Sequence, residues 1–280
     1  AMAARATHSA SGAASSSDDA SRCLLLALSH DELGVIFDGL ADPLQPVVAV
    51  ALSSTCLGLR TPLRAALEVL KERHARAAAL CRKLKTSCAA LRVAVELVWG
   101  DKGLTADDMA TLAMILQTNG LPRLREIDLY NNGFGDAGMQ AFCEGLGHDA
   151  APSLPTLDLG GNNIGPVGAE AFAAALRRGA LPKLSSLNLT SNPIGNQGVA
   201  ALAAPLRKLP ALTKLILVKN EIGDEGVASL VAQPTAGALK KLLVLREPNF
   251  AFHRHFGGVI YLFLRGMTGS DQRGVYFRAL

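Results

Sequence analysis

The sequence predicts an α/β solenoid, with short parallel strands on one side and helices on the other, preceded by a small all-α segment. The solenoid is predicted by a phrase that occurs four times: leucine, two residues, an aliphatic residue, one residue, leucine, two residues, asparagine, one residue, an apolar residue and glycine. The copies begin at Leu124, Leu154, Leu184 and Leu212. Their asparagines are spaced by 30, 30 and 28 residues, at Asn132, Asn162, Asn192 and Asn220. Such a period is typical of stacked repeats rather than of a globule with one central core.

Each copy predicts a strand that ends in a turn. In the first copy Ile127 and Leu129 alternate with polar residues, which is the period of a strand with one buried face. Asn132 marks the turn, because a short amide can bond buried backbone groups, and stacked copies should form a ladder. The glycines that follow suit a left-handed backbone: Gly135, Gly165, Gly195 and Gly223. The next residues are predicted to cap the start of a helix: Asp136, Asn196 and Asp224, with Pro166 in the second copy.

A helix is predicted after each turn, because apolar residues recur there at i, i+3 and i+7. They are Met139, Phe142 and Leu146, then Ala169, Phe172 and Leu176, then Val199, Leu202 and Leu206. A helix needs about 10 Å of width, whereas parallel strands lie about 4.8 Å apart, so stacking must curve the array. We therefore expect the strands to line a concave surface and the helices a convex one.

The repeated phrase resembles the leucine-rich repeat family, specifically its ribonuclease-inhibitor-like class, which has long repeats and true helices on the convex side. The resemblance covers residues 121 to about 232. A weaker copy precedes it, with Lys102 in place of the asparagine, and a fragment with Glu247 at that position follows it. Their apolar positions are Leu97, Trp99, Leu104, Met109, Leu112 and Leu116, and Leu239, Leu242 and Val244. Terminal repeats that lose the consensus act as caps, so the array is predicted over residues 93–245.

Residues 23–60 are predicted to form a helical head. Ser29 and Glu32 have the spacing of a capping box, and the Asp42-Pro43 pair ends this helix before a second, apolar one. The segment resembles an F-box through Leu28, Asp31, Glu32, Leu33, Ile36, Leu40, Asp42, Pro43, Leu52, Ser53 and Cys56. The resemblance implies docking onto the adaptor of a cullin-type ubiquitin ligase through Leu28, Leu33, Ile36, Leu40 and Pro43. The alternative is a helical cap that shields the open edge of the first repeat.

Residues 61–92 predict a long amphipathic helix or helix pair. One face carries mostly apolar residues whose spacing alternates between four and three positions, a seam of the heptad type: Leu63, Leu67, Leu70, His74, Ala77, Cys81, Leu84, Cys88 and Leu91. The other face is basic, with Arg60, Arg64, Lys71, Arg73, Arg76, Arg82, Lys83, Lys85 and Arg92 against Glu68 and Glu72. In one interpretation the seam packs on the head or the first repeat and the basic face is solvated. In the other, the basic face meets an acidic partner or an anionic membrane surface.

The two ends of the chain differ in composition from the middle. Residues 1–22 are rich in alanine and serine and are expected to be disordered, with a transit peptide as the alternative. Residues 246–280 combine aromatic side chains with arginines, a mixture that interfaces use as hot spots. We expect this tail to be a C-terminal cap or a partner-binding segment.

The composition and motifs of the chain exclude several classes of function. A net charge of +4 is too small to indicate nucleic acid, and no apolar run reaches the length of a membrane helix. The five cysteines include no CxxC pair, which favours a reducing compartment: cytoplasm or nucleus, with organellar import as the alternative. Motifs for nucleotide binding, for hydrolysis and for metal ligation are absent from the sequence, so we predict no cofactor, no metal and no catalytic residue.

The strand pattern predicts which side chains line the concave surface. Counted by register, the candidate protein-binding residues are Glu126, Asp128, Tyr130, Thr156, Asp158, Ser186, Asn188, Thr190, Lys214 and Ile216. Asp128 and Asp158 should lie about 5 Å apart on adjacent strands, where they repel unless a cation meets them. We therefore expect a protein ligand that presents a basic side chain beside Tyr130. The alternative is that these residues are merely solvated.

The whole pattern indicates a non-enzymatic protein–protein interaction protein. The F-box resemblance implies a substrate receptor of a cullin-type ubiquitin ligase. The alternative is a structural or assembly subunit, a scaffold whose repeats, basic helix and aromatic tail contact neighbours in a larger complex.

Overall fold

The computed structural model describes residues 29–55, 57–118, 121–147, 151, 153–231, 241–246 and 259–264. Leu28, the tail predicted over residues 1–22 and most of residues 246–280 lie outside these ranges. The chain divides into two compact units, one with residues up to Ala41 together with Pro46–Lys71, the other with Asp42–Gln45 and everything from Glu72. One continuous helix, α3 (Leu57–Lys83), contributes to both units. The predicted boundaries at residues 60 and 92 stay predictions.

The first unit is a small helical head. Helix α1 (His30–Leu40) begins with the predicted capping box, in which the Ser29 side chain accepts from the Glu32 N–H and the Glu32 carboxylate accepts from the Ser29 N–H. Helix α2 (Val47–Thr55) and the first part of α3 complete the unit. Their buried side chains form one small core: Leu33, Phe37, Ala41, Ala49, Leu63 and Leu70. The predicted two helices around Asp42-Pro43 are therefore confirmed.

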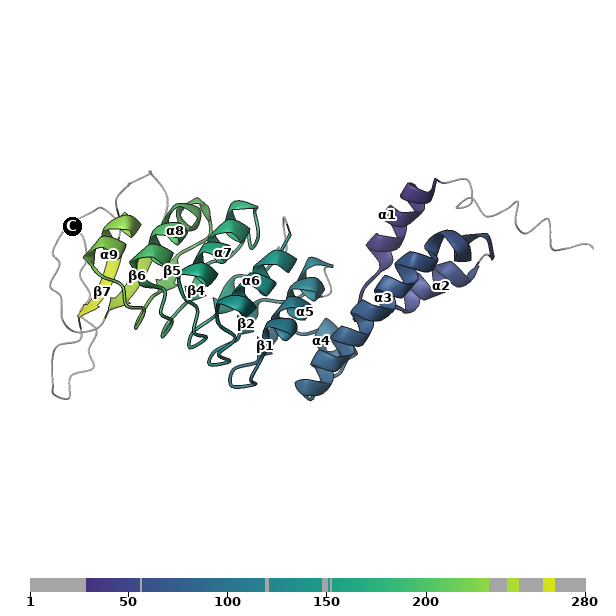
Figure 1. The fold of residues 1–280 in the computed structure, drawn as a ribbon, viewed down its shortest axis with the longest axis horizontal. Helices are drawn as coiled ribbons and strands as arrows, with labels where there is room; N and C mark the ends of the chain where they lie inside the picture. The colour runs from purple at the N-terminus through teal and green to yellow at the C-terminus, as the bar shows by residue number, and fades with distance from the viewer. Residues whose placement is uncertain are drawn as a thin grey trace, which may run out of the picture. The chain divides into compact units, whose positions relative to one another are not determined.

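The second unit contains a row of strand–helix repeats (Figure 1). Its elements are β1 (Glu96–Val98), α5 (Ala106–Gln117), β2 (Glu126–Asp128), α6 (Gly135–Gly145), β3 (Thr156–Asp158), α7 (Pro166–Arg177), β4 (Ser186–Asn188), α8 (Gly195–Lys208), β5 (Lys214–Ile216) and α9 (Asp224–Val231). The strands form one parallel sheet in the order β1-β2-β3-β4-β5. Each helix packs on the next along the row, which is the predicted α/β solenoid.

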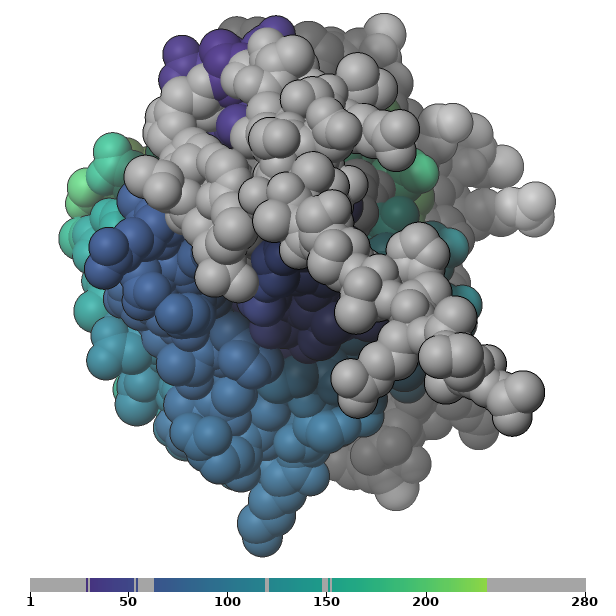
Figure 2. Space-filling view, turned by 90° about the vertical axis from the view of Figure 1, so that its right-hand side faces the viewer, coloured from purple at the N-terminus to yellow at the C-terminus, as the bar shows by residue number. Residues whose placement is uncertain are grey.

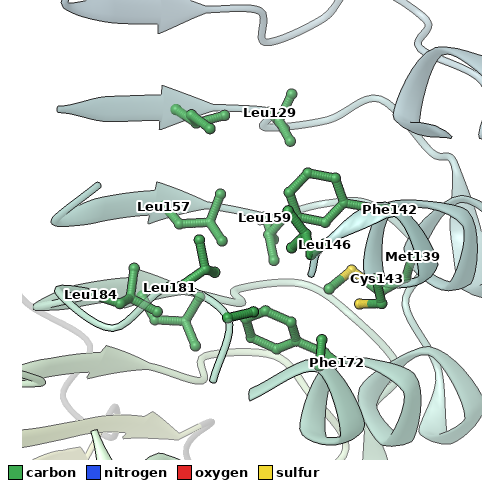
Figure 3. Close-up of a cluster of buried hydrophobic side chains, with 14 of the residues drawn as sticks. Leu129, Met139, Phe142, Cys143, Leu146, Leu157, Leu159, Phe172, Leu181 and Leu184 are labelled. Carbon is green, nitrogen blue, oxygen red and sulfur yellow. The ribbon is translucent and has the colours of Figure 1, made fainter. Parts of the chain in front are cut away.

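The core of the array lies between the strands and the helices. Leu157 and Leu159 of one repeat point toward Phe142 of the preceding helix, and Phe172 follows one repeat later (Figure 3). All four side chains are almost completely buried. The predicted apolar positions of the weaker first copy are buried as well, so β1 and α5 form a true repeat without the consensus asparagine.

The asparagine ladder is confirmed. Asn162 is fully buried, and its Oδ1 accepts from the N–H groups of Asn132 (2.9 Å) and Gly133 (3.1 Å) in the preceding repeat. Its Nδ2 donates to the carbonyl of Leu129 (2.9 Å). Asn132 and Asn192 bond the repeats before them in the same way. One amide per repeat thus satisfies turn groups that are closed off from water.

The left-handed turns recur at a position that the sequence did not indicate. Gly135 (φ 64°) and Gly195 (φ 63°) are left-handed as predicted, whereas Gly165 (φ −92°) is not, and neither is Gly223. The residue before each ladder position is left-handed throughout: Asp101, Asn131, Gly161, Ser191 and Lys219, with φ of 56°, 54°, 68°, 54° and 56°. This conformation turns the chain where the strand ends, while the N–H still bonds the neighbouring strand's end, as Asn131 does with the Gly160 carbonyl at 2.8 Å.

The predicted helix caps act on a different helix from the one expected. Asp136 follows Gly135 inside α6, and no side chain caps α6 at its N-cap residue, Phe134. Oδ1 of Asp136 instead accepts from the N–H groups of Gly165 (2.6 Å) and Gly168 (2.9 Å), at the start of α7 in the next repeat. Asn196 does the same for the start of the repeat after it, accepting from Gly223 at 2.6 Å. The stacking of repeats therefore places Asp136 and Asn196 beside the next helix rather than their own. Pro166 begins its own helix, α7, as predicted.

We predict that Asp136→Ala lowers the free energy of unfolding by about 1–2 kcal/mol, because two N–H groups at the start of α7 lose their acceptor. Asp136→Asn keeps an oxygen acceptor and should cost clearly less. Urea denaturation followed by circular dichroism measures both changes. Equal losses for the two variants would contradict the assignment of Asp136 as the cap of α7.

The first repeat is covered by the last part of α3, by α4 (Cys88–Arg92) and by residues 42–45. Leu44, Ala77, Leu80, Cys81 and Leu91 belong to the same core as the repeats. The seam predicted over residues 61–92 is thus buried or half-buried, and the apolar residues of its later half pack on the array.

Polar contacts hold the elements that cover the first repeat, which we call the cap of the array, in place. The ring N–H of His74 donates from Nδ1 to the Pro43 carbonyl (2.8 Å), and Arg92 bonds the Asp42 carboxylate (2.7 Å). Lys83 forms an ion pair with Asp108 at the start of α5. Burial alone would raise the pKa of Asp108, but hydrogen bonds from Lys83 and Thr105 outweigh it and lower that pKa below its ordinary value.

Two further strands follow the array. Strand β6 (Lys241–Arg246) includes Leu242 and Val244 of the repeat fragment that was predicted after the four copies. Strand β7 (Val259–Leu264) lies in the predicted tail. They pair in parallel, from Lys241 opposite Val259 to Arg246 opposite Leu264.

Candidate functional site

The concave surface carries three aligned rows of side chains. The strand register aligns Glu96, Glu126, Thr156, Ser186 and Lys214 in the first row, and Val98, Asp128, Asp158, Asn188 and Ile216 in the second. Backbone bonds just past the strands align Tyr130, Gly160, Thr190 and Val218 in the third. In each strand the residue between the first two rows is buried, so these rows face away from the helices. The structure thus brings the ten predicted residues together on one face.

Charge is distributed unevenly along these rows. The first three repeats carry Glu96, Glu126, Asp128 and Asp158, which we call the acidic surface. The two repeats that follow are neutral or apolar in the second row and end with Lys214 in the first. Within the described ranges, no side chain of the acidic surface forms an ion pair. Among the residues that the structure describes, these four carboxylates therefore have no ion-pair partner.

Asp128 and Asp158 are held by local hydrogen bonds. Oδ1 of Asp128 accepts from the Tyr130 N–H (2.9 Å), and Oδ1 of Asp158 accepts from the Gly160 N–H (2.8 Å). Oδ2 of Asp158 also accepts from the Asn188 side chain at 2.9 Å. Neighbouring amides therefore orient the two carboxylates, and their pairing with a cation from a ligand stays a prediction.

Glycines on both sides shape the surroundings of Tyr130. A Cβ atom added to Gly160 would lie 3.0 Å from Cδ2 of Tyr130, so the ring lies against the bare backbone of the next repeat. A Cβ atom added to Gly100 would lie 3.6 Å from both carboxylate oxygens of Asp128. Tyr130 is 44% exposed. A Cβ atom on Gly160 would also lie 3.2 Å from Oδ1 of Asp158, so the exposed ring of Tyr130 and this half-buried carboxylate flank the same glycine. An aromatic ring close to a carboxylate is a suitable environment for a guanidinium or ammonium group.

The predicted adaptor-binding residues of the head differ in exposure. Leu28 lies outside the described residues, Leu33 and Pro43 are buried, Ile36 is half-buried and Leu40 is exposed. The sequence interpretation missed the more exposed apolar side chains of the same unit: Val35, Val47, Val48, Val50 and Val69. The valines of α2, Val47, Val48 and Val50, could have signalled this surface, because an amphipathic helix normally keeps its exposed face polar.

The basic face predicted for residues 61–92 is present on the surface. Arg64, Lys71, Arg76, Arg82 and Lys85 are exposed, in the region of the chain coloured blue in Figure 2. Lys71 pairs with Glu68, and Lys83 and Arg92 are engaged with Asp108 and Asp42. Part of the basic face thus stabilises the cap itself.

The described ranges contain no cluster of three or more histidine, cysteine, aspartate or glutamate residues that could hold a metal ion. Among the helices that the structure describes, none combines the length and the apolar character that crossing a bilayer requires.

Comparison with known proteins bears on the repeats. A family model described as Leucine Rich repeat matches residues 121–143, 150–173, 180–203 and 208–231. These matches coincide with the units that end in α6, α7, α8 and α9. The RecBCD enzyme subunit RecB of Haemophilus influenzae is 50% identical over 40 residues, which cover 14% of this chain and 3% of that protein. The chain therefore spans a very small part of that relative, and the likeness concerns one short segment.

Proposed function

Because residues 121–231 consist of four leucine-rich repeats, we propose that the protein is a non-enzymatic protein-binding module. Its ligand is a protein that lies along the concave rows and places a lysine or arginine beside Tyr130. The proposal rests on the strand register, which aligns Glu126 with Glu96 and Asp128 with Asp158. A solenoid suits this function, because it offers a long continuous surface rather than a closed pocket.

The acidic surface supports a basic ligand. The whole chain has a net charge of +4, so the concentration of carboxylates in the first rows is local and opposite in sign to the rest. Oδ2 of Asp128 accepts no hydrogen bond within the described ranges, which leaves it free for a donor from the ligand. Complementary charge of this kind speeds association and excludes acidic partners.

The rows also suggest how the chemical character of the ligand changes along the array. After Asp158 the second row continues with Asn188 and Ile216, and the third ends with Val218. A ligand with basic residues at one end and apolar residues at the other would match both parts.

A narrower version of this proposal is a substrate receptor of a cullin-type ubiquitin ligase, whose head docks on the adaptor. The F-box resemblance supports it, together with the exposed apolar side chains Leu40, Val47 and Val48 on α1 and α2. The ribonuclease-inhibitor-like class of repeat would agree with the helices α6 to α8, which have 11, 12 and 14 residues. The alternative is a scaffold or assembly subunit that holds its neighbours through residues 246–280.

The proposal is tested by affinity purification followed by binding measurements with the recovered partner. Asp128→Asn combined with Asp158→Asn removes two charges but keeps the oxygen acceptors that orient the turns. We expect an affinity about 10- to 100-fold lower at physiological salt, and a weaker dependence on salt concentration. Biolayer interferometry at several salt concentrations measures both.

The matched control is Asp107→Asn with Glu170→Gln, which removes two exposed charges from helices α5 and α7. Equal effects of the two double variants would refute the concave surface as the binding site. In the same purification, an adaptor and a cullin lost on deletion of residues 29–55 would favour the receptor. A stoichiometric complex lost on deletion of residues 246–280 would favour the assembly subunit.

A further inference from the structure

Two cysteines meet where the cap of the array reverses direction. Cys81 lies near the end of α3 and is buried, whereas Cys88 is the first residue of α4 and is half-buried. Their Sγ atoms are 3.5 Å apart, with the Cys88 thiol donating to Cys81. The third free cysteine in the described ranges, Cys143, is buried in α6 and contacts no thiol there.

The backbone holds this pair in place. The N–H of Thr86 bonds the carbonyl of Cys81 (2.9 Å) and the N–H of Lys85 bonds that of Arg82 (3.1 Å), with Lys85 left-handed at φ 55°. This is the Schellman arrangement that ends a helix. Ser87 then caps α4 by accepting from the Ala90 N–H (3.1 Å). The approach of the two sulfurs therefore follows from a well-defined corner between helices rather than from a flexible loop.

We propose that Cys81 and Cys88 are a reversible dithiol–disulfide pair that responds to low-molecular-weight disulfides such as oxidised glutathione. A disulfide needs the sulfurs about 2.05 Å apart, so closure requires an approach of about 1.5 Å from the observed separation. Rotation about the side-chain bonds of Cys88 supplies a shift of this size, because that residue is partly open to solvent.

The reaction has two exchange steps. Cys88 loses its proton, its thiolate attacks one sulfur of oxidised glutathione, and one glutathione thiolate leaves, so that a mixed disulfide forms on Cys88. Cys81 then loses its proton and attacks Sγ of Cys88, which releases the second glutathione. Two protein thiols are oxidised, one glutathione disulfide is reduced to two thiols, and no other reactant is needed.

The order of attack follows from exposure and acidity. Burial, the largest cause, raises the pKa of Cys81 to about 12, so Cys81 is the resolving thiol rather than the first nucleophile. Resolution of the mixed disulfide should accelerate as pH rises, roughly tenfold per pH unit below that pKa, because the thiolate fraction of Cys81 grows in proportion.

The disulfide would join α3 to α4 beneath the first repeat. Both cysteines contact the core that Leu80, Leu91 and Trp99 share with the array. A cross-link across this short corner removes conformational freedom from the unfolded chain and should raise the unfolding temperature by about 3–8 °C. The oxidation state of the pair would thus set how firmly the cap covers the end of the array.

The test uses the full chain with Cys23→Ser and Cys56→Ser, incubated in glutathione buffers of defined oxidised-to-reduced ratio. Trypsin cuts after Arg76, Arg82, Lys85 and Arg92, so the disulfide links fragments 77–82 and 86–92, which mass spectrometry identifies. We expect this linked pair, its loss with Cys81→Ser or Cys88→Ser, and its reversal by reduced glutathione. Cys143→Ser is the matched control and should leave the link intact.

Three outcomes would overturn the proposal. The first is a stable glutathione adduct on Cys88 that never yields the linked fragments, even at pH 9. The second is a link that involves Cys143. The third is no modification at any ratio of oxidised to reduced glutathione. Calorimetry of the reduced and oxidised forms gives a separate check, since an unchanged unfolding temperature would refute the role in the cap.

Discussion

Asn192→Ala is expected to lower the free energy of unfolding by about 3–5 kcal/mol. Oδ1 of Asn192 accepts from the N–H groups of Asn162 (3.0 Å) and Ile164 (2.9 Å), and its Nδ2 donates to the Leu159 carbonyl (3.0 Å). Alanine leaves these three backbone groups without their side-chain partner at a site that is 1% exposed. Each buried unpaired group costs about 1–3 kcal/mol, and entry of water would recover part of that cost. Guanidinium denaturation followed by circular dichroism measures the loss.

Asn220→Ala is the matched comparison within the same ladder. Its Nδ2 donates to the carbonyls of Leu189 (2.8 Å) and Val218 (3.0 Å), and each of these also accepts a bond from another donor, Asn192 or Ser191. Its Oδ1 is buried and has no partner within the described residues. The loss should therefore be about half that of Asn192→Ala or less. Equal losses would contradict the view that accepted backbone bonds dominate the ladder.

Phe172→Ala is expected to cost about 3–5 kcal/mol, because it removes a ring that is 1% exposed from the middle of the array. The ring of Phe172 lies in the same layer as Leu181 and Leu184, below Phe142 of the preceding repeat (Figure 3). A cavity there weakens contact between α7 and both neighbouring helices. In a solenoid, stability depends on such nearest-neighbour interfaces, so we also expect unfolding to become less cooperative. Differential scanning calorimetry would show a lower and broader transition.

Val167→Ala provides the control on the same helix, since Val167 is 53% exposed and should change stability by less than about 0.5 kcal/mol. A Phe172→Ala loss as small as that of Val167→Ala would show that the repeats are not coupled through this layer. Phe172→Leu, which keeps most of the volume, should fall between the two.

The repeats could be predicted in detail because their signal is local and occurs four times. The alternation around Ile127 predicted β2, and the register of the rows followed from the spacing of the copies. Ser29 and Glu32 likewise predicted their own capping box, since the two partners lie three residues apart. Side chains that bond within a few residues of themselves can be assigned from the pattern alone.

Contacts across repeats were harder to predict. Asp136 has the residue type and position of a local helix cap, yet it bonds Gly165 and Gly168, about 30 residues away. The Asn188 side chain that supports Asp158 also lies 30 residues away. Which helix or turn receives such a bond depends on the lateral offset between stacked repeats, and a one-dimensional pattern does not contain that offset.

The sequence by itself determined the solenoid, its buried faces, the asparagine ladder and the acidic rows. These follow from a repeated alternation of apolar and polar residues, which can bury its leucines in essentially one way. The tertiary structure decided which helix Asp136 caps, that α3 and α4 cover the first repeat, and that Cys81 meets Cys88. The physical reason is distance: these contacts depend on how preformed elements pack against one another, and packing is set by the shape of the whole interface.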